Sequence, residues 1–237
     1  MTDRYAVMGN PIGHSKSPYI HARFAEQTGE DLAYDAILVE PGDFPAAVAR
    51  FRAAGGKGLK VTVPFKQEAW ALAQRRSGRA ERAGAVNTLR WESDGTLYGD
   101  TTDGVGLVRD LKDNHSVQLA GRRLLLLGAG GAVRGVLEPL LAEDPLELVI
   151  ANRTVARAEE LAHSFAWLGP IRACGFEALA GRQFDVVING TAASLQGEVP
   201  PLPAGVLASG AVCHDMMYGK EPTAFLRWAT AAGAAQT

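Results

Sequence analysis

A glycine-rich loop follows an apolar strand in the second half of the chain. The strand covers Leu124 to Leu127, and the loop that follows reads Gly128-Ala129-Gly130-Gly131-Ala132, before a predicted helix. Glycine lets the backbone turn tightly, so that N–H groups can approach a pyrophosphate at the positive end of the helix. A purely structural turn is the alternative, and a P-loop is excluded because no Gly-Lys-Ser or Gly-Lys-Thr follows. The pattern indicates half of a dinucleotide site.

Two arginines indicate which dinucleotide this site prefers. The next predicted strand ends at Asn152-Arg153-Thr154, and Arg157 lies one helical turn further on. An NAD site usually has Asp or Glu at this strand end to bind the ribose 2′-hydroxyl, whereas guanidinium groups suit a 2′-phosphate. Each charged hydrogen bond contributes roughly 1.5 to 3 kcal/mol, so two would favour NADP by about a hundredfold or more. NADP is the expected cofactor.

A second group of polar side chains lies near residues 15 to 103, where predicted strands pass into helices. These candidates carry hydroxyl, amide, ammonium or carboxylate groups: Ser15, Ser17, Thr62, Lys66, Asn87 and Asp103. Hydroxyl and backbone N–H groups can bind a carboxylate without a competing ion pair. A lysine ammonium can donate a proton to an oxygen that gains negative charge, and a neighbouring carboxylate can orient it. The structural alternatives are N-caps for Ser17 and Asp103 and a solvated helix position for Lys66.

Alternating strands and helices must position these groups. The first half is predicted to contain strands at 5–8, 32–39 and 59–63, helices at 17–27 and 43–54, and a hairpin of 86–91 and 96–98. A helix at 103–112 leads to strands at 124–127, 146–151, 186–189 and 211–215. After the third of these, Asn189-Gly190-Thr191 either shapes the cofactor pocket or only turns the chain.

The predicted fold class is α/β with two domains. Residues 1–102 would form an N-terminal α/β substrate-binding and catalytic domain, and residues 103–237 an NADP-binding, Rossmann-type doubly wound parallel sheet. Ligands of such sheets bind at the carboxyl ends of the strands, so a cleft between the domains is expected.

The composition excludes several other function classes. The 237 residues carry a net charge of −2, so no nucleic-acid or anionic-membrane surface is indicated and a small molecule is the expected partner. The first residues lack the layout of an export signal and no apolar run approaches a membrane span, so a cytoplasmic location is expected. Cys174 and Cys213 are expected to be buried thiols, and the histidines show no metal-ligand spacing, so no metal is predicted.

Six segments together resemble the shikimate dehydrogenase family, in its order and at its separations. They are Asn10-Pro-Ile-Gly-His-Ser-Lys-Ser-Pro18, Val61-Thr-Val-Pro-Phe-Lys66, Gly84-Ala-Val-Asn-Thr88, Thr102-Asp-Gly104, Gly128-Ala-Gly-Gly-Ala132 and Asn152-Arg-Thr154. Segments spread over nearly the whole chain are far more specific than one motif. The resemblance implies reversible, NADPH-dependent reduction of the C3 carbonyl of 3-dehydroshikimate to shikimate, in aromatic amino acid biosynthesis.

The resemblance also implies roles for individual residues. Ser15 and Ser17 would bind the substrate carboxylate, while Thr62, Asn87 and Asp103 would bind the ring hydroxyls. Lys66 and Asp103 would form the catalytic pair. Tyr218 and Met216 resemble family positions that line the substrate and nicotinamide ends of the cleft. NADP would be bound by the glycine loop and the strand-end group: Gly128, Ala129, Gly130, Gly131, Ala132, Asn152, Arg153, Thr154 and Arg157.

Three features depart from the family pattern. The family usually has Asn at the positions of Lys60 and Thr101. Lys60 is expected on the strand face of Thr62, and two ammonium groups about 4 Å apart repel by roughly 4 kcal/mol at an effective dielectric near 20. Weaker substrate binding or a shifted pH optimum is therefore expected. The family's usual C-terminal segment, with a helix that returns to the first domain, would follow Thr237, where this sequence ends.

Two other functions are compatible with the sequence. One is a quinate/shikimate dehydrogenase with relaxed cofactor use, although members that prefer NAD typically have an acid at the position of Arg153. The other is a catalytically impaired NADP-binding homologue, which Lys60, Thr101 and the missing segment suggest. The chain is expected to be a monomer or a homodimer.

Overall fold

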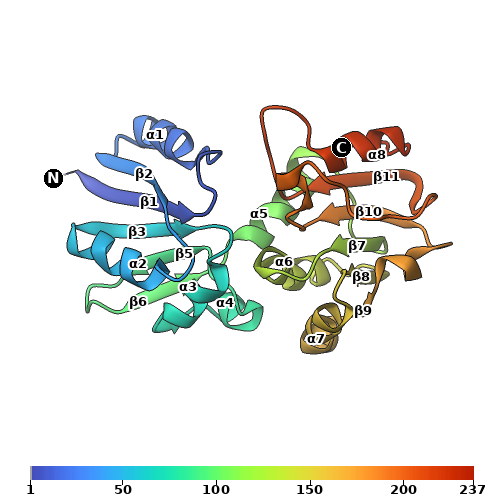
Figure 1. Ribbon diagram of the computed structural model, residues 1–237, viewed down its shortest axis with the longest axis horizontal. Helices are drawn as coiled ribbons and strands as arrows, with labels where there is room; N and C mark the ends of the chain where they lie inside the picture. Colours follow the sequence, from blue (N-terminus) through green and yellow to red (C-terminus); the bar gives the residue numbers. More distant parts are fainter. Residues whose placement is uncertain (1) are drawn as a thin grey trace. The chain divides into compact units, whose positions relative to one another are not determined.

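The computed structural model describes residues 2–237, apart from the side chain of Leu195. The chain divides into two compact units, Met1–Thr102 (unit 1) and Asp103–Thr237 (unit 2), each with its own sheet (Figure 1). No helix of the described chain is long and apolar enough to cross a membrane.

Unit 1 is built on a six-stranded mixed sheet in the order β2-β1-β3-β5-β6-β4. Its strands are β1 (Asp3–Gly9), β2 (Leu32–Leu38), β3 (Gly56–Val61), β4 (Arg75–Arg76), β5 (Thr88–Trp91) and β6 (Leu97–Asp100). Its helices are α1 (Ser17–Thr28), α2 (Phe44–Ala53), α3 (Lys66–Leu72) and α4 (Gly78–Ala83). Strands β1, β2 and β3 are parallel, and β5 and β6 form the predicted antiparallel hairpin.

The two faces of this sheet are covered by different helices. On one face Met8 and Val61 are buried in a core with Phe44 of α2 and with Phe65, whose rings stack at 5.0 Å. Helix α1 packs against β1 and β2, where His21 stacks on Tyr34 at 4.1 Å. Side chains alternate between the faces of a strand, so the buried core and the α1 side draw on alternate positions of the same strands.

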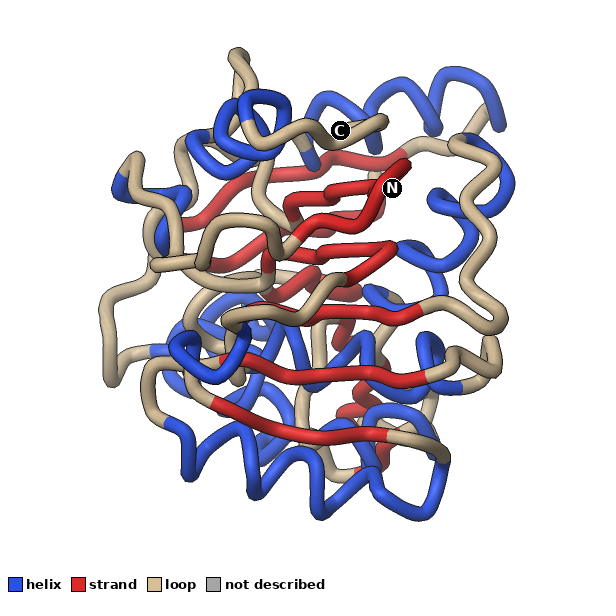
Figure 2. The backbone as a smooth tube through the Cα atoms, turned by 90° about the vertical axis from the view of Figure 1, so that its right-hand side faces the viewer, coloured by secondary structure: helices blue, strands red, loops and turns tan. Residues whose placement is uncertain are grey.

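Unit 2 is built on five parallel strands in the order β11-β10-β7-β8-β9 (Figures 1 and 2). The strands are β7 (Arg123–Leu127), β8 (Glu147–Ala151), β9 (Ile171–Cys174), β10 (Phe184–Asn189) and β11 (Leu207–Asp215). The α-helices are α5 (Asp103–Arg109), α6 (Gly131–Leu141), α7 (Val155–Phe165) and α8 (Ala224–Ala231). A π-helical turn, η1 (Asp110–Asn114), extends α5, and short 3₁₀ helices are η2 (Ala166–Leu168), η3 (Phe176–Leu179) and η4 (Ala193–Gln196).

Both faces of the parallel sheet are buried. Leu124 and Leu126 belong to a core with residues of α5, α6 and α7, whereas Leu125 and Leu127 belong to a second core with Phe225 of α8. A strand that is covered on both faces has a continuous run of apolar residues in its sequence, because neither face contacts water. The predicted α/β class with a doubly wound parallel sheet is confirmed.

The structure differs from the sequence-based expectations in local details. Ser17 is the first residue of α1 rather than its N-cap, which is Lys16, because Pro18 is tolerated within the first helical turn. Cys213 is buried, but Cys174 is only half-buried. Strand β4 was not predicted, because two arginines carry no apolar alternation.

Candidate active site

The glycine loop of unit 2 has the conformation that its sequence requires. Gly128 follows β7 with a φ of +105°, which favours glycine, and Gly130 is the N-cap of α6. A Cβ on Gly128 would lie 3.2 Å from the carbonyl oxygen of Gly190, so the two turns are packed closely. The first turn of a helix leaves N–H groups without helical acceptors. These groups, at Gly131 and the next residues, are available to an anion such as a pyrophosphate.

The dinucleotide-binding pattern Gly-x-Gly-x-x-Gly has its third glycine at the position of Val133, and in this chain another glycine makes room for Val133. The Val133 side chain is buried, and a Cβ on Gly190 would lie 2.6 Å from its Cγ2. The third glycine of the pattern usually lets the helix pack closely against the neighbouring strands. Here Gly190, in the turn after β10, provides that space instead. Gly190 is therefore a part of the loop's geometry that the motif alone does not reveal.

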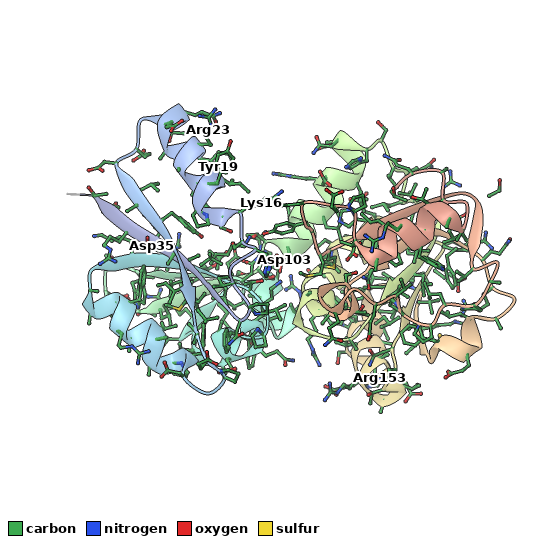
Figure 3. The ribbon with its side chains drawn as sticks, turned by 45° about the horizontal axis from the view of Figure 1, so that its top comes forward. Lys16, Tyr19, Arg23, Asp35, Asp103 and Arg153 are labelled. Atoms are coloured by element: carbon green, nitrogen blue, oxygen red, sulfur yellow. The ribbon has the colours of Figure 1, made fainter. Side chains whose placement is uncertain are left out.

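Arg153, just after β8, and Arg157, within α7, are both exposed, and Figure 3 shows where Arg153 lies on unit 2. Asn152 shapes this turn by donating from Nδ2 to the carbonyl oxygen of Thr154 at 2.8 Å, and Thr154 is the N-cap of α7. Among the ion pairs of the described residues, none includes Arg153 or Arg157. Two exposed guanidinium groups at one strand end suit a phosphate group.

In unit 1 the backbone brings three of the predicted polar residues together. Thr62 N donates to Met8 O at 3.0 Å, and Val61 N donates to Asn87 O at 2.7 Å. Lys66 O accepts from Val86 N at 2.9 Å. Thr62, Lys66 and Asn87 are therefore anchored around the carboxyl ends of β1 and β3, which is the edge where ligands bind in such sheets.

The Asn87 side chain is buried and already oriented. Its Oδ1 accepts from Thr102 N at 3.1 Å and from Thr88 Oγ1 at 2.8 Å, and its Nδ2 donates to Thr102 Oγ1 at 3.1 Å. Thr102 immediately precedes Asp103. The amide group of Asn87 thus holds Thr102, in the short segment between β6 and Asp103, the candidate catalytic carboxylate. Lys66 is half-buried at the first position of α3.

Ser15 and Ser17 are held together at the start of α1. Ser17 N donates to Ser15 Oγ at 3.3 Å, and Ser17 is buried while Ser15 is half-buried. Lys16, between them, lies at the same end of the helix (Figure 3). Two hydroxyl groups at the N-terminal end of a twelve-residue helix suit an anionic group.

Gly9 is a site residue that the sequence did not reveal. A Cβ at this position would lie 2.4 Å from Thr62 Cγ2 and 3.1 Å from the carbonyl oxygen of Val63. Only glycine leaves room there for Thr62, so Gly9 sets the position of a predicted substrate-binding side chain. Its only sequence signal was a glycine at a strand end, directly before Asn10.

Asp103 begins helix α5, which packs very closely on α6. A Cβ on Gly104 would lie 2.4 Å from the carbonyl oxygen of Gly135 and 2.6 Å from Cγ of Pro139. In a regular helix the carbonyl oxygen of Gly135 would accept from the N–H of residue 139, four positions later. That residue is Pro139, which has no N–H. The carbonyl of Gly135, which lacks its usual helical donor, therefore faces the backbone of α5. This contact fixes Asp103 relative to the helix that starts at the glycine loop.

Lys60 lies in a groove of about 350 Å³ on unit 1. Asn87, Thr88 and Thr102 also line the groove, but Thr62 and Lys66 do not. His21 lines it too, and burial, together with the positive charge of Lys60, lowers the pKa of His21. Lys60 therefore lines the same groove as Asn87 and Thr102.

Met216 and Tyr218 follow β11 in unit 2. Met216 is half-buried, and its N donates to Asn189 O at 2.9 Å. Tyr218 is 47% exposed. Two buried side chains, at the ends of β10 and β11, hold the loop that carries Met216 and Tyr218. No sequence pattern indicated this role. Those side chains are Asn189 and Asp215, which are hydrogen-bonded to each other.

Comparison with known protein families adds an independent observation. Residues 7–89 match the shikimate dehydrogenase substrate binding domain, and residues 110–196 match the shikimate/quinate 5-dehydrogenase family. The chain is 64% identical to the NADP(+) shikimate dehydrogenase of Alkalilimnicola ehrlichii and 61% identical to that of Methylococcus capsulatus. These matches cover 99% and 95% of this chain, and 86% and 81% of the relatives.

A solved structure supports the same relationship. The shikimate 5-dehydrogenase of Thermus thermophilus, in complex with NADP(H) and shikimate, superposes with a TM-score of 0.85 at 33% identity. The superposition covers 100% of this chain and 87% of that chain. The resemblance seen in the six sequence segments is confirmed, and this chain belongs to the shikimate dehydrogenase family.

Proposed function

We propose that this chain catalyses the reversible, NADP-dependent interconversion of 3-dehydroshikimate and shikimate, with the substrate bound by unit 1 and the cofactor by unit 2. The chain is an oxidoreductase acting on a CH–OH group. The observation that carries the residue assignment is the convergence of Thr62, Lys66 and Asn87 at one edge of the unit 1 sheet. These are the polar types that a polyhydroxylated ring with a reducible carbonyl requires.

The residues of unit 2 fit the cofactor. Gly128 has a φ of +105°, which favours glycine, helix α6 starts at the loop, and Arg153 and Arg157 are exposed at the next strand end. The loop would hold the pyrophosphate and the arginines the 2′-phosphate, with Met216 beside the nicotinamide. When bound, NADPH supplies the hydride.

The residues of the chain would handle the substrate and the proton. Ser15 and Ser17 would bind the substrate carboxylate, and Thr62 and Asn87 the ring hydroxyls. Tyr218 would line the substrate end of the site. Lys66 Nζ would donate a proton to the carbonyl oxygen as negative charge develops there, and would take it back in the oxidation direction. Asp103 would accept from a ring hydroxyl and act as the partner of Lys66.

A direct assay tests this function. NADPH absorbance is followed after shikimate is added to the full chain with NADP, and again with NAD and with quinate. We expect turnover with NADP and shikimate to exceed the other combinations. Binding of NADP without any turnover would support the impaired homologue instead, and in that case the Lys60→Asn and Thr101→Asn variants would show whether these residues are the cause.

Location and assembly form part of the same proposal. We infer a cytoplasmic enzyme that is a monomer or a homodimer. Size-exclusion chromatography with light scattering distinguishes these two states.

A further inference from the structure

We propose that Asp215 is a positioning residue for the cofactor end of the reaction. Through Asn189, its carboxylate would fix the turn at Gly190 and the loop at Met216, which flank the glycine loop within unit 2. The inference rests on the proposed function, because it concerns NADP binding at the same site.

Asp215 ends β11 as a buried carboxylate with four neutral donors. It is 8% exposed. Its Oδ1 accepts from Asn189 Nδ2 at 3.1 Å and from Met217 N at 3.0 Å. Its Oδ2 accepts from Ser194 Oγ at 2.6 Å and from Thr223 Oγ1 at 2.5 Å. The donors come from three separate segments, so one carboxylate joins them.

One arm of this network leads to the cofactor loop. Asn189 is fully buried, and its Oδ1 accepts from Thr191 N at 3.1 Å and from Thr191 Oγ1 at 2.7 Å. Gly190 N donates to Leu127 O at 2.9 Å, and Met216 N donates to Asn189 O at 2.9 Å. The amide of Asn189, once oriented by Asp215, therefore sets the turn that follows β10 and is anchored directly beside Met216.

That turn is packed against the candidate cofactor residues without spare room. A Cβ on Gly190 would lie 2.6 Å from Val133 Cγ2 and 3.3 Å from Met216 Sδ, and a Cβ on Gly128 would lie 3.2 Å from Gly190 O. A shift of the turn by a few tenths of an ångström would therefore reach Gly128 and Met216. Cofactor sites tolerate little misplacement of this kind.

The other arm of the network is structural. Thr223 is the N-cap of α8, and its Oγ1 accepts from Leu226 N at 3.2 Å. Removing this hydroxyl weakens the helix cap but leaves the contacts of Asp215 with Asn189 and Met217 in place. The two arms can therefore be tested separately.

Asp185 provides a matched control on the same sheet. It lies near the amino end of β10, and its Oδ2 accepts from Arg123 N at 2.8 Å and from Arg123 Nε at 3.3 Å. It is thus a hydrogen-bonded carboxylate at the opposite end of the strand that carries Asn189. A purely structural role predicts the same behaviour for both carboxylates.

The experiment measures the Kd of NADP by calorimetry, KM and kcat for both substrates, and the melting temperature. For Asp215→Ala we expect about a tenfold rise in the Kd and KM of NADP, with the KM of shikimate changed less than about twofold. Asp215→Asn should recover most of the affinity. Its carbonyl oxygen can still accept from Met217 N, and the hydroxyls of Ser194 and Thr223 can rotate to accept from its amide. Asp185→Ala and Thr223→Val should lower the melting temperature only.

Several outcomes would overturn the inference. One is an unchanged Kd of NADP in Asp215→Ala, and another is an equal rise in the KM of both substrates. A loss of NADP affinity in Asp185→Ala or Thr223→Val as large as that in Asp215→Ala would also overturn it. If Asp215→Ala does not fold, Asn189→Ala carries the same expectation for the Kd of NADP. Absence of shikimate turnover in the parent chain would instead reject the proposed function, and the Kd comparison would still test this inference.

Discussion

Arg153 and Arg157 in unit 2 are exposed and belong to none of the ion pairs of the described residues, whereas Asn87 in unit 1 is buried and hydrogen-bonded on both ends of its amide. A phosphate can be bound by mobile cations, because charge attraction acts over distance and requires little orientation. Ring hydroxyls must meet donors and acceptors at set angles, because hydrogen bonds weaken steeply when bent. The candidate substrate region of unit 1 therefore depends on its neighbours, while the arginine region of unit 2 depends on its own charges.

The largest effect is expected at Lys66, where the chemistry itself is lost. Lys66→Ala should lower kcat by about 10² to 10⁴, since it removes the proton donor, and should leave the Kd of NADP unchanged. Steady-state kinetics and calorimetry provide the two measurements. Lys57→Ala, at an exposed position of β3, is the matched control and should retain full activity. A Lys66→Ala enzyme with near-parental kcat would remove Lys66 from the mechanism.

Crowding the contact between α5 and α6 should come next. Gly104→Ala would place a methyl group 2.4 Å from Gly135 O, so α5 must shift and carry Asp103 with it. We expect kcat to fall about tenfold or more and stability to fall by roughly 1 to 3 kcal/mol. Gly106→Ala in the same helix meets no atom within 4 Å and should behave like the parent. Equal kinetics for the two variants would show that this contact does not position Asp103.

The arginine region is tested by removing its charge. Arg153→Ala should lower kcat/KM for NADP by about tenfold or more and leave kcat/KM for NAD nearly unchanged, because only NADP carries the 2′-phosphate. The ratio of the two values measures the effect. Arg172→Ala, another exposed arginine of unit 2, is the control. Parallel losses with both cofactors would indicate a structural role for Arg153.

A steric change in unit 1 should show the dependence on neighbours. Gly9→Ala would bring a methyl group to 2.4 Å from Thr62 Cγ2, so Thr62 must move. The KM of shikimate should rise about fivefold to tenfold, with the Kd of NADP unchanged, because about one hydrogen bond to the ring is weakened. Gly13→Ala has no atom within 4 Å and serves as the control. If both variants keep the parental KM, Thr62 does not bind the ring.

The smallest effect is an acid dependence of stability in unit 1. Burial raises the pKa of Asp100, but hydrogen bonds from Arg79, Ser77 and the backbone of Thr101 outweigh it and hold this pKa below its ordinary value of 3.8. The carboxylate therefore stabilises the fold above about pH 4, and this contribution is lost as the pH falls through the lowered pKa.

The comparison of Asp100→Asn with the parent measures that contribution. The variant should be less stable at neutral pH, and the difference should shrink below about pH 4 in chemical denaturation experiments. Asp113→Asn, at an exposed position in unit 2, is the control. A difference between Asp100→Asn and the parent that stays constant down to about pH 2 would contradict the assignment.

Much of the fold and of the site followed from local sequence patterns. The apolar run at Leu124 to Leu127 indicated a strand with both faces buried, and the glycines after it indicated a tight turn and a helix start, as the structure shows. Such features depend on backbone conformation and on burial, which a few adjacent residues control. Local patterns placed the start of α1 to within one residue. Ser17, expected as the N-cap, is the first helical residue, and Lys16 is the N-cap.

The sequence by itself determined the order of the polar clusters, the glycine loop and the arginine-rich strand end, because each is a property of neighbouring residues. Tertiary structure alone decided the contacts that set their positions. Gly9 makes room for Thr62, Gly104 packs on Gly135, and Asp215 orients Asn189. The two residues of each pair are far apart in the chain. A pattern of neighbouring residues therefore cannot predict which glycine must leave space for a distant group, or which distant side chain an aspartate will bond.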